Sequence, residues 1–144
     1  MKTFKVVFCV LTTVIMATFS ACTSEDGDWE SMKWNTNTDM VRKSDEWYLK
    51  VSKEGGTFRF SCENYGSFWF ASVEEMNDGK RTMYYPRQED YKHIISSWAE
   101  MKIENNELIV TIRPNDKSME RTLKLTVQAG DIFSSFGFYQ VSGK

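Results

Sequence analysis

The sequence predicts an all-β protein with mainly antiparallel sheets. Apolar and polar residues alternate over several short runs, and Asn, Asp, Gly or Pro residues separate these runs, as expected for strands joined by turns. No long stretch has apolar residues at helical spacing. We therefore expect about seven or eight strands, with a loop or short helix inserted near residues 86–97, where the alternation is lost.

Residues 1–21 have the features of a signal peptide. Lys2 and Lys5 precede an apolar run, residues 6–19, which is shorter than the roughly 20 residues that span a bilayer. Residues 19–22 read Phe-Ser-Ala-Cys and resemble a bacterial lipobox, in which the Cys is acylated and becomes the new N-terminus. Ordinary secretory cleavage before Ala21 is the alternative. We expect lipidation at Cys22, and thus a protein that a lipid anchor holds at a membrane it does not enter.

Residues 22–30 are predicted to form an acidic, flexible tether, because they are polar and contain Gly. Acidic residues directly after the lipidated Cys also resemble the export signal of surface lipoproteins in Bacteroidetes. That resemblance implies a location in the cell envelope, at the outer membrane or cell surface.

Residues 31–144 have a length that suits one domain with a single core. Loss of the leader removes Lys2 and Lys5 from 18 basic residues, so 16 would face 20 acidic residues, a net charge of −4. This charge disfavours nucleic acid and anionic lipid surfaces as partners. Of the three cysteines, Cys9 lies in the leader and Cys22 is the lipidation site, so Cys62 has no disulfide partner.

The first half of the domain predicts four strands. Met32 to Trp34 suits a short first strand. Trp47–Val51 and Thr57–Ser61 both alternate, and Gly55-Gly56 between them predicts a hairpin with an apolar inner face. Ser67–Val73 is dense in aromatic residues, and alternation places Phe68 and Phe70 on one face and Trp69 on the other.

A hairpin is predicted next, since Asn77-Asp78-Gly79 leads from Ser67–Val73 into the run Lys80–Tyr85, which Pro86 ends. The clearest pattern lies between Ser97 and Val141, which divides into four short strands that we expect to form an antiparallel meander. Arg121 begins one of these strands, and its guanidinium is expected to bond to a carboxylate or to loop carbonyls.

Residues 97–141 resemble the BACON family, whose members are modules of Bacteroidetes proteins with an immunoglobulin-like sandwich fold. The resemblance consists of a Trp, an L-x-V-x-I strand, Pro-Asn, a strand that runs from Glu-Arg-Thr to Ala-Gly-Asp, and an aromatic strand that ends in Gln. It implies an immunoglobulin-like antiparallel β-sandwich and, by the family's name, a proposed carbohydrate-binding role. The Gly55-Gly56-Thr57 turn near the start of the domain fits the same pattern. The matching positions within residues 97–141 are Trp98, Leu108, Val110, Ile112, Pro114, Asn115, Glu120, Arg121, Thr122, Ala129, Gly130, Asp131 and Gln140.

The residues favour a protein that is not an enzyme. His93 is the only histidine, so a multi-histidine metal site is excluded and a Ser-His-Asp arrangement has one possible base. Glycoside hydrolysis needs two carboxylates placed across a cleft. The candidate pairs are instead neighbours in sequence: Glu74 with Glu75, and Glu89 with Asp90. No phosphate-binding loop, calcium loop or CxxC pair is present. We expect no catalytic residue, no metal and no cofactor.

Aromatic residues make up 15% of the chain, and four of them are candidates for ligand binding. Sugars stack on exposed rings, and Tyr and Trp add a polar group for sugar hydroxyls; the alternative is that these rings belong to the core. The candidates are Trp69, Tyr84, Tyr85 and Tyr91. The sequence predicts a non-catalytic surface module that binds glycan or mucin. The alternative function is a structural or adaptor subunit that docks a protein partner in an envelope complex.

The lipid anchor leads to the first testable prediction. Because acylation of the Cys22 thiol would hold the protein in the membrane, Cys22→Ser should move it from the detergent phase to the aqueous phase in a detergent partitioning assay. Equal partitioning of the variant and the wild type would show that Cys22 carries no anchor.

Overall fold

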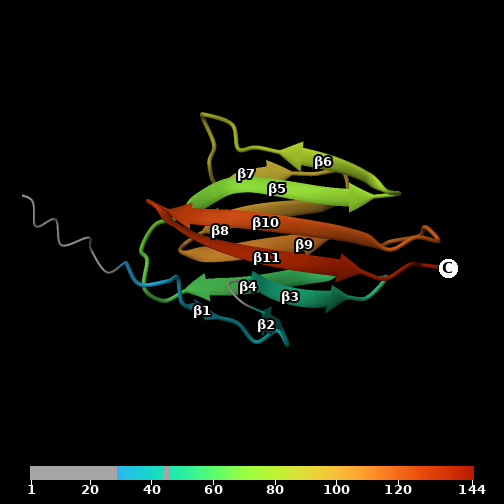
Figure 1. Ribbon diagram of the computed structural model, residues 1–144, viewed down its shortest axis with the longest axis horizontal. Helices are drawn as coiled ribbons and strands as arrows, with labels where there is room; N and C mark the ends of the chain where they lie inside the picture. Colours follow the sequence, from blue (N-terminus) through green and yellow to red (C-terminus); the bar gives the residue numbers. More distant parts are fainter. Residues whose placement is uncertain (1–28, 44–45) are drawn as a thin grey trace, which may run out of the picture. The chain divides into compact units, whose positions relative to one another are not determined.

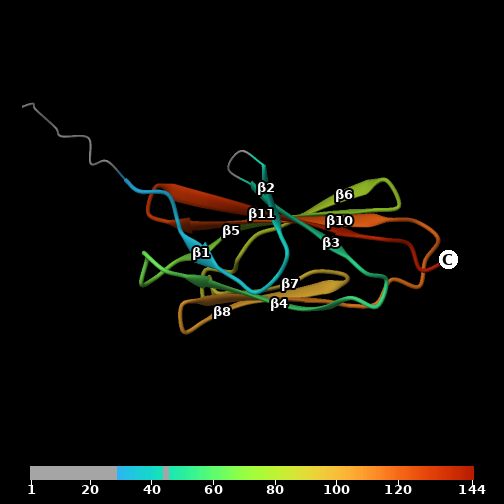
Figure 2. The ribbon, with the colours of Figure 1, turned by 90° about the horizontal axis from the view of Figure 1, so that it is seen from below.

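Two sheets pack face to face in the computed structural model, which describes residues 29–43 and 46–144 (Figures 1 and 2). The region Ser31–Lys144 forms one compact unit. Its described residues contain eleven strands and no helix, so the all-β prediction is confirmed, although the strands outnumber the seven or eight expected. The predicted signal peptide, the lipidation site Cys22 and most of the tether lie outside the described residues.

The larger sheet has six strands in the order β2-β3-β11-β10-β5-β6. Neighbouring strands are antiparallel except β3 and β11, which run parallel. The sheet is therefore mixed. Its strands are β2 (Val41–Lys43), β3 (Glu46–Val51), β5 (Trp69–Asn77), β6 (Lys80–Tyr84), β10 (Arg121–Ala129) and β11 (Ile132–Gln140).

The smaller sheet has five strands, all antiparallel, in the order β1-β4-β9-β8-β7. In Figure 2 the two sheets are seen edge-on as separate layers. Its strands are β1 (Trp34–Asn35), β4 (Gly56–Cys62), β7 (His93–Ile95), β8 (Ala99–Glu104) and β9 (Glu107–Ile112).

The predicted β5–β6 hairpin is confirmed, but two other pairings predicted from the sequence are wrong. Strands β3 and β4 belong to different sheets, so they do not form a hairpin. The expected C-terminal meander is two hairpins, β8–β9 in the smaller sheet and β10–β11 in the larger one. Alternation fixes which side chains face inward, but it does not say which strand is the neighbour. The crossings between sheets give the predicted immunoglobulin-like sandwich.

Gly55 illustrates why the β3–β4 connection crosses between the sheets. Its φ is +75°, and a Cβ atom at this position would lie 2.1 Å from the carbonyl oxygen of Ile112 in β9. Only glycine permits both this backbone conformation and this close approach. The connection therefore lies against the end of β9 and delivers the chain into the smaller sheet, where β4 pairs with β9 from Gly56 to Ser61.

The short helix considered near residues 86–97 is also wrong. His93–Ile95 forms the edge strand β7 and pairs with Glu100–Lys102 of β8. Ile94 is buried between the sheets while Ile95 is exposed. Three residues are too few for alternation to be recognised in the sequence, and pairing with β8 determines their conformation.

The core between the sheets is rich in aromatic rings. Trp34 packs edge-on against Phe68 and Phe136, with ring centroids 5.2 and 5.0 Å apart, and Phe60 contacts Phe136 and Phe138. Such pairs contribute roughly 0.5–1.5 kcal/mol each beyond the burial of their surface. The buried thiol of Cys62 is free, so within the described region the fold is held by packing and hydrogen bonds.

A buried arginine joins several chain crossings at one end of the sandwich. Arg121 is 6% exposed, and its guanidinium donates to the side-chain oxygen of Gln140 at 2.8 Å and to the carbonyl oxygens of Arg113 and Pro114 at 2.9 and 3.0 Å. It also lies over the ring of Trp98, 4.4 Å from the centroid. The expected bonds to loop carbonyls are confirmed. Burial lowers the pKa of Arg121, because desolvation disfavours its charge.

Gln140 extends this network to the β3–β4 connection. Its amide nitrogen donates to the carbonyl oxygens of Ser52, Lys53 and Arg113 at 3.1, 3.3 and 3.0 Å. Two side chains thus satisfy the loop carbonyls of both the β3–β4 and the β9–β10 crossings. We call Arg121, Gln140 and these carbonyl groups the polar clamp.

Removing the polar clamp should destabilise the fold. We expect Arg121→Ala to lower the free energy of unfolding by about 3 kcal/mol, because the Pro114 carbonyl and the side-chain oxygen of buried Gln140 lose their donor. Arg59→Ala is the control, since Arg59 pairs with Glu107 at 2.6 Å but its side chain is 56% exposed, and it should cost less than about 1 kcal/mol. Equal urea midpoints for the two variants would contradict this role.

Candidate functional site

Trp69 lies on the outer face of the larger sheet because of a β-bulge. Phe70 pairs with Val127 and Ser72 with Thr126, so the register of β5 shifts by one residue around Ala71. The shift lets both Phe70 and Val73 face the core while Trp69 and Ser72 face outward. Phe68 and Phe70 are buried and Trp69 is half-buried, as the alternation of these three residues predicts.

The loop before β7 fixes Tyr91 beside Trp69. Arg87 and Asp90 form a tight turn, in which the Asp90 amide donates to the Arg87 carbonyl at 3.0 Å. The Tyr91 carbonyl accepts from the amide of Phe70 at 3.0 Å, and the Lys92 carbonyl accepts from the amide of Ile103 at 2.8 Å. The loop is therefore bonded to β5 in one sheet and β8 in the other.

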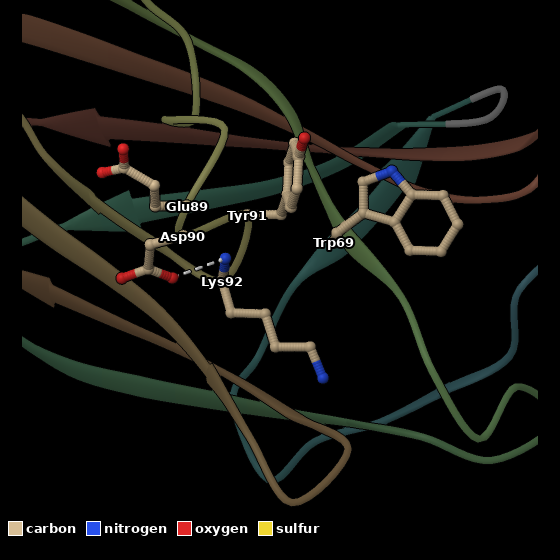
Figure 3. Close-up of a pocket in the computed structure, with 5 residues that line it drawn as sticks. All are labelled: Trp69, Glu89, Asp90, Tyr91 and Lys92. Atoms are coloured by element: carbon tan, nitrogen blue, oxygen red, sulfur yellow. Dashed lines mark hydrogen bonds between the residues drawn. The ribbon is translucent and has the colours of Figure 1, made fainter.

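Trp69 and Tyr91 line one open hollow of ≈ 550 Å³, which we call the Trp69 hollow. Tyr91 is 49% exposed. Glu89, Asp90 and Lys92 complete the lining, and the Asp90 carboxylate accepts from the amide of Lys92 at 3.0 Å. Figure 3 shows the Tyr91 ring between the loop carboxylates and the Trp69 indole, with the Lys92 side chain directed away from both carboxylates. Two rings and three charged groups therefore border the same surface.

Tyr84 and Tyr85 lie outside the Trp69 hollow. They line a second hollow of ≈ 620 Å³ on the other side of the loop, together with Arg87 and His93, and Glu89 and Asp90 border both. The pairing of Val73 with Tyr84 places Tyr84 on the inner face of β6, whereas Tyr85 follows the strand and is 67% exposed. The structure therefore brings Trp69 together with Tyr91 in one hollow and places Tyr84 and Tyr85 in the other.

Tyr84 has a structural contact inside the sandwich. Its hydroxyl donates to the carboxylate of Glu75 at 3.1 Å, and Ser97 donates to the same oxygen. Burial, and then the bond to this carboxylate, raise the pKa of Tyr84. The second oxygen of Glu75 and the indole nitrogen of Trp98 are buried without a protein partner. The hydroxyl of Tyr84 therefore belongs to a buried polar cluster, while the residue also lines the second hollow.

A second aromatic surface, which the sequence did not predict, lies on the larger sheet. Tyr48 and Tyr139 lie on its outer face with ring centroids 5.7 Å apart and line a hollow of ≈ 390 Å³. Tyr48 donates to the carboxylate of Glu46, which raises the pKa of Tyr48 to about 12. A Cβ atom on Gly137 would lie 2.9 Å from the Tyr48 ring, so the glycine makes room for it. Both tyrosines occupy positions that alternate with the buried residues of their strands. This alternation in the sequence could have identified them as outward-facing rings.

His93 lies between two carboxylates, with its Nδ1 3.9 Å from Asp90 and its other ring nitrogen beside Glu100. Its Nε2 lies 2.9 Å from Glu100, and this contact, followed by that of Lys102, lowers the pKa of Glu100. Within residues 29–43 and 46–144, no group of three or more His, Cys, Asp or Glu side chains is placed to hold a metal ion. That same part of the chain also contains no helix long and apolar enough to cross a membrane.

The contact between Tyr84 and Glu75 leads to a comparison of two adjacent tyrosines. Tyr84→Phe should lower the free energy of unfolding by about 1–2 kcal/mol, because a buried carboxylate loses a donor, whereas exposed Tyr85→Phe should leave it unchanged. The pKa of Tyr84 is higher in the folded protein than in the unfolded chain, where it is about 10. The contribution of Tyr84 to the free energy of unfolding is therefore fully present below about pH 10 and is lost as the pH rises through the pKa of the folded state. Urea unfolding at pH 7 and pH 11 would show a difference between wild type and Tyr84→Phe that narrows at high pH. A constant difference would contradict this account.

Comparison with known proteins finds similar chains among solved structures. No family model and no curated protein matches the chain. The M1 domain from titin shares 15% identity and has a TM-score of 0.42, covering 78% of this chain and 95% of that domain, and the titin M4 structure shares 10% identity at the same TM-score, covering 79% and 98%. A protein from Bacteroides thetaiotaomicron, solved by NMR, shares 36% identity with a TM-score of 0.66, covering 87% of this chain and 98% of its own. The chain belongs to the same family as this Bacteroides thetaiotaomicron protein.

Proposed function

We propose that the protein is a non-catalytic module that binds glycan through the Trp69 hollow. The observation that carries this proposal is the placement of two partly exposed rings, Trp69 and Tyr91, on one open hollow that charged side chains border. Sugar rings present flat C–H faces that stack on aromatic rings, and their hydroxyl groups bond to polar groups at the edge. Glu89, Asp90 and Lys92 are such groups.

The rigidity of the loop supports this function. Backbone bonds from Tyr91 to Phe70 and from Lys92 to Ile103 hold the loop in place in the absence of a ligand. A ligand therefore meets rings that are already ordered, and binding loses less conformational entropy than it would on a mobile loop. A sugar that binds weakly depends on this smaller entropy loss, because few groups contribute to its affinity.

The arrangement of carboxylates supports binding without catalysis. Glycoside hydrolysis uses two carboxyl groups that face each other across the scissile bond, about 5–10 Å apart. The carboxylates of the Trp69 hollow, Glu89 and Asp90, are consecutive residues on one side of Tyr91 (Figure 3). Neither carboxylate lies opposite the other. They can accept hydrogen bonds from a ligand at the edge of the hollow, but they are not placed as a catalytic acid and base.

The BACON resemblance and the lipobox-like residues 19–22 support a location in the cell envelope. We infer a lipoprotein that Cys22 anchors at the outer membrane or cell surface of the bacterium, with the sandwich presented on a short acidic tether. An anchored module of this kind would hold glycan or mucin close to the cell. The lipid is its membrane contact, and its net negative charge makes nucleic acid an unsuitable partner.

A glycan array with purified protein tests the proposed function. Trp69→Ala and Tyr91→Ala should each weaken sugar binding at least tenfold, because each removes a stacking ring. Tyr139→Ala is the control, since Tyr139 is an exposed ring on the same sheet but outside the Trp69 hollow. Thermal midpoints within a few degrees of the wild type for Tyr91→Ala would show that the fold is intact. Failure of the wild type to bind any sugar would refute the glycan function and favour the alternative, an adaptor that docks a protein.

A further inference from the structure

Phe133 is a large exposed ring for which the fold gives no structural reason. It lies near the start of β11 and is 58% exposed. Inner-face neighbours on the same strand, Phe136 and Phe138, are fully buried, so β11 does not lack apolar surface to anchor it. A single exposed ring is common on protein surfaces, but a ring that lies in line with other exposed rings can form part of an interaction site.

The strand register aligns Phe133 with the Trp69 hollow. Phe133 pairs with Gln128 of β10, and Gln128 pairs with Trp69 of β5. Residues in register on adjacent strands point to the same face, so all three lie in one row across the outer face of the larger sheet. Tyr91 prolongs the row, since its carbonyl bonds to the amide of Phe70 at the free side of β5. The row therefore reads Tyr91, Trp69, Gln128 and Phe133.

The next row along these strands is uncharged. Thr126 pairs with Ser135 on one side and with Ser72 on the other, and the hydroxyl groups of Thr126 and Ser135 lie 3.0 Å apart. Charged side chains border this row: Glu46 of β3 pairs with Ser135 at its end, and Lys124 pairs with Glu74 one row further. Aromatic rings, one amide and three hydroxyl groups thus form a neutral strip across three strands. We call it the outer strip, and its residues are Trp69, Gln128, Phe133, Ser72, Thr126 and Ser135.

The spacing of the outer strip suits a chain ligand. Adjacent strands lie about 4.8 Å apart, so the backbones at Trp69 and Phe133, two strands apart, are separated by roughly 10 Å. The two rings flank Gln128, whose amide can both donate and accept hydrogen bonds. Two stacking surfaces with a bonding group between them match a linear chain whose sugar rings repeat, and the lack of charge in the strip favours a neutral one.

We propose that the outer strip is an extended binding site for a neutral, linear oligosaccharide. The chain would cross β5, β10 and β11 from the Trp69 hollow to Phe133, with one sugar stacked at each end and hydroxyl groups bonded to Gln128 and to the row of Ser and Thr residues. This proposal rests on the glycan-binding function and adds the ligand's class and its direction across the sheet.

Isothermal titration with sugars of increasing length tests the extended site. The probes are the disaccharides and hexasaccharides of β-1,4-linked glucose, xylose and mannose. For the series that binds, we expect the wild type to bind the hexasaccharide about tenfold more tightly than the disaccharide. Phe133→Ala should abolish this gain without changing disaccharide binding, whereas Trp69→Ala should weaken both. Tyr139→Ala, an exposed ring also on β11 but outside the strip, is the control and should bind as the wild type does.

The possible outcomes separate the two proposals. If Phe133→Ala binds the hexasaccharide as tightly as the wild type while Trp69→Ala loses binding, the extended site is wrong and the proposed function stands. Equal affinity of the wild type for disaccharide and hexasaccharide would overturn the extended site in the same way. If none of these neutral chains binds to the wild type, the extended site is again wrong, and the glycan array then decides whether the glycan function itself fails.

Discussion

The polar clamp is the interaction on which the arrangement of the sandwich depends. Arg121 and Gln140 are both buried, so each must find partners inside the protein. The partners are carbonyl groups in the β3–β4 and β9–β10 connections, where the chain passes from one sheet to the other. The clamp therefore links distant segments at one end of β10 and β11. It also explains why a charged residue can begin a strand whose inner face is otherwise apolar.

The candidate site lies at the other end of the same strands. β10 runs from Arg121 in the clamp to Gln128 beside Trp69, and β11 runs back from Phe133 to Gln140. The inner faces of both strands are committed to the core, since Leu123, Leu125 and Phe136 are fully buried or nearly so. Their outer faces are free, and the register that the clamp and the hairpin impose sets which outer side chains become neighbours. Binding residues on such strands are positioned more rigidly than residues on loops.

Two local features complete the site on this rigid base. The bulge at Ala71 lets Trp69 face outward while Phe70 and Val73 keep contact with the core. The loop of residues 87–92 forms the edge of the site, and backbone hydrogen bonds to strands of both sheets hold it there. The same loop separates the Trp69 hollow from the hollow that contains Tyr84, so neighbouring aromatic residues have different roles. Tyr84 donates to one oxygen of the buried Glu75 carboxylate, and Tyr91 remains open to solvent.

The sequence alone determined the all-β class, the inner and outer faces of the long strands and the outward position of Trp69, and it limited the partners of Arg121 to a carboxylate or loop carbonyls. These features follow from a period of two and from the need of a buried charge for partners, both of which act locally. Only the tertiary structure decided which strands pair, that β3 runs parallel to β11, and that His93–Ile95 is a strand. It also decided that Tyr91 and Phe133 share a row with Trp69. Pairing depends on how much surface two distant segments bury together, and alternation carries no information about that choice.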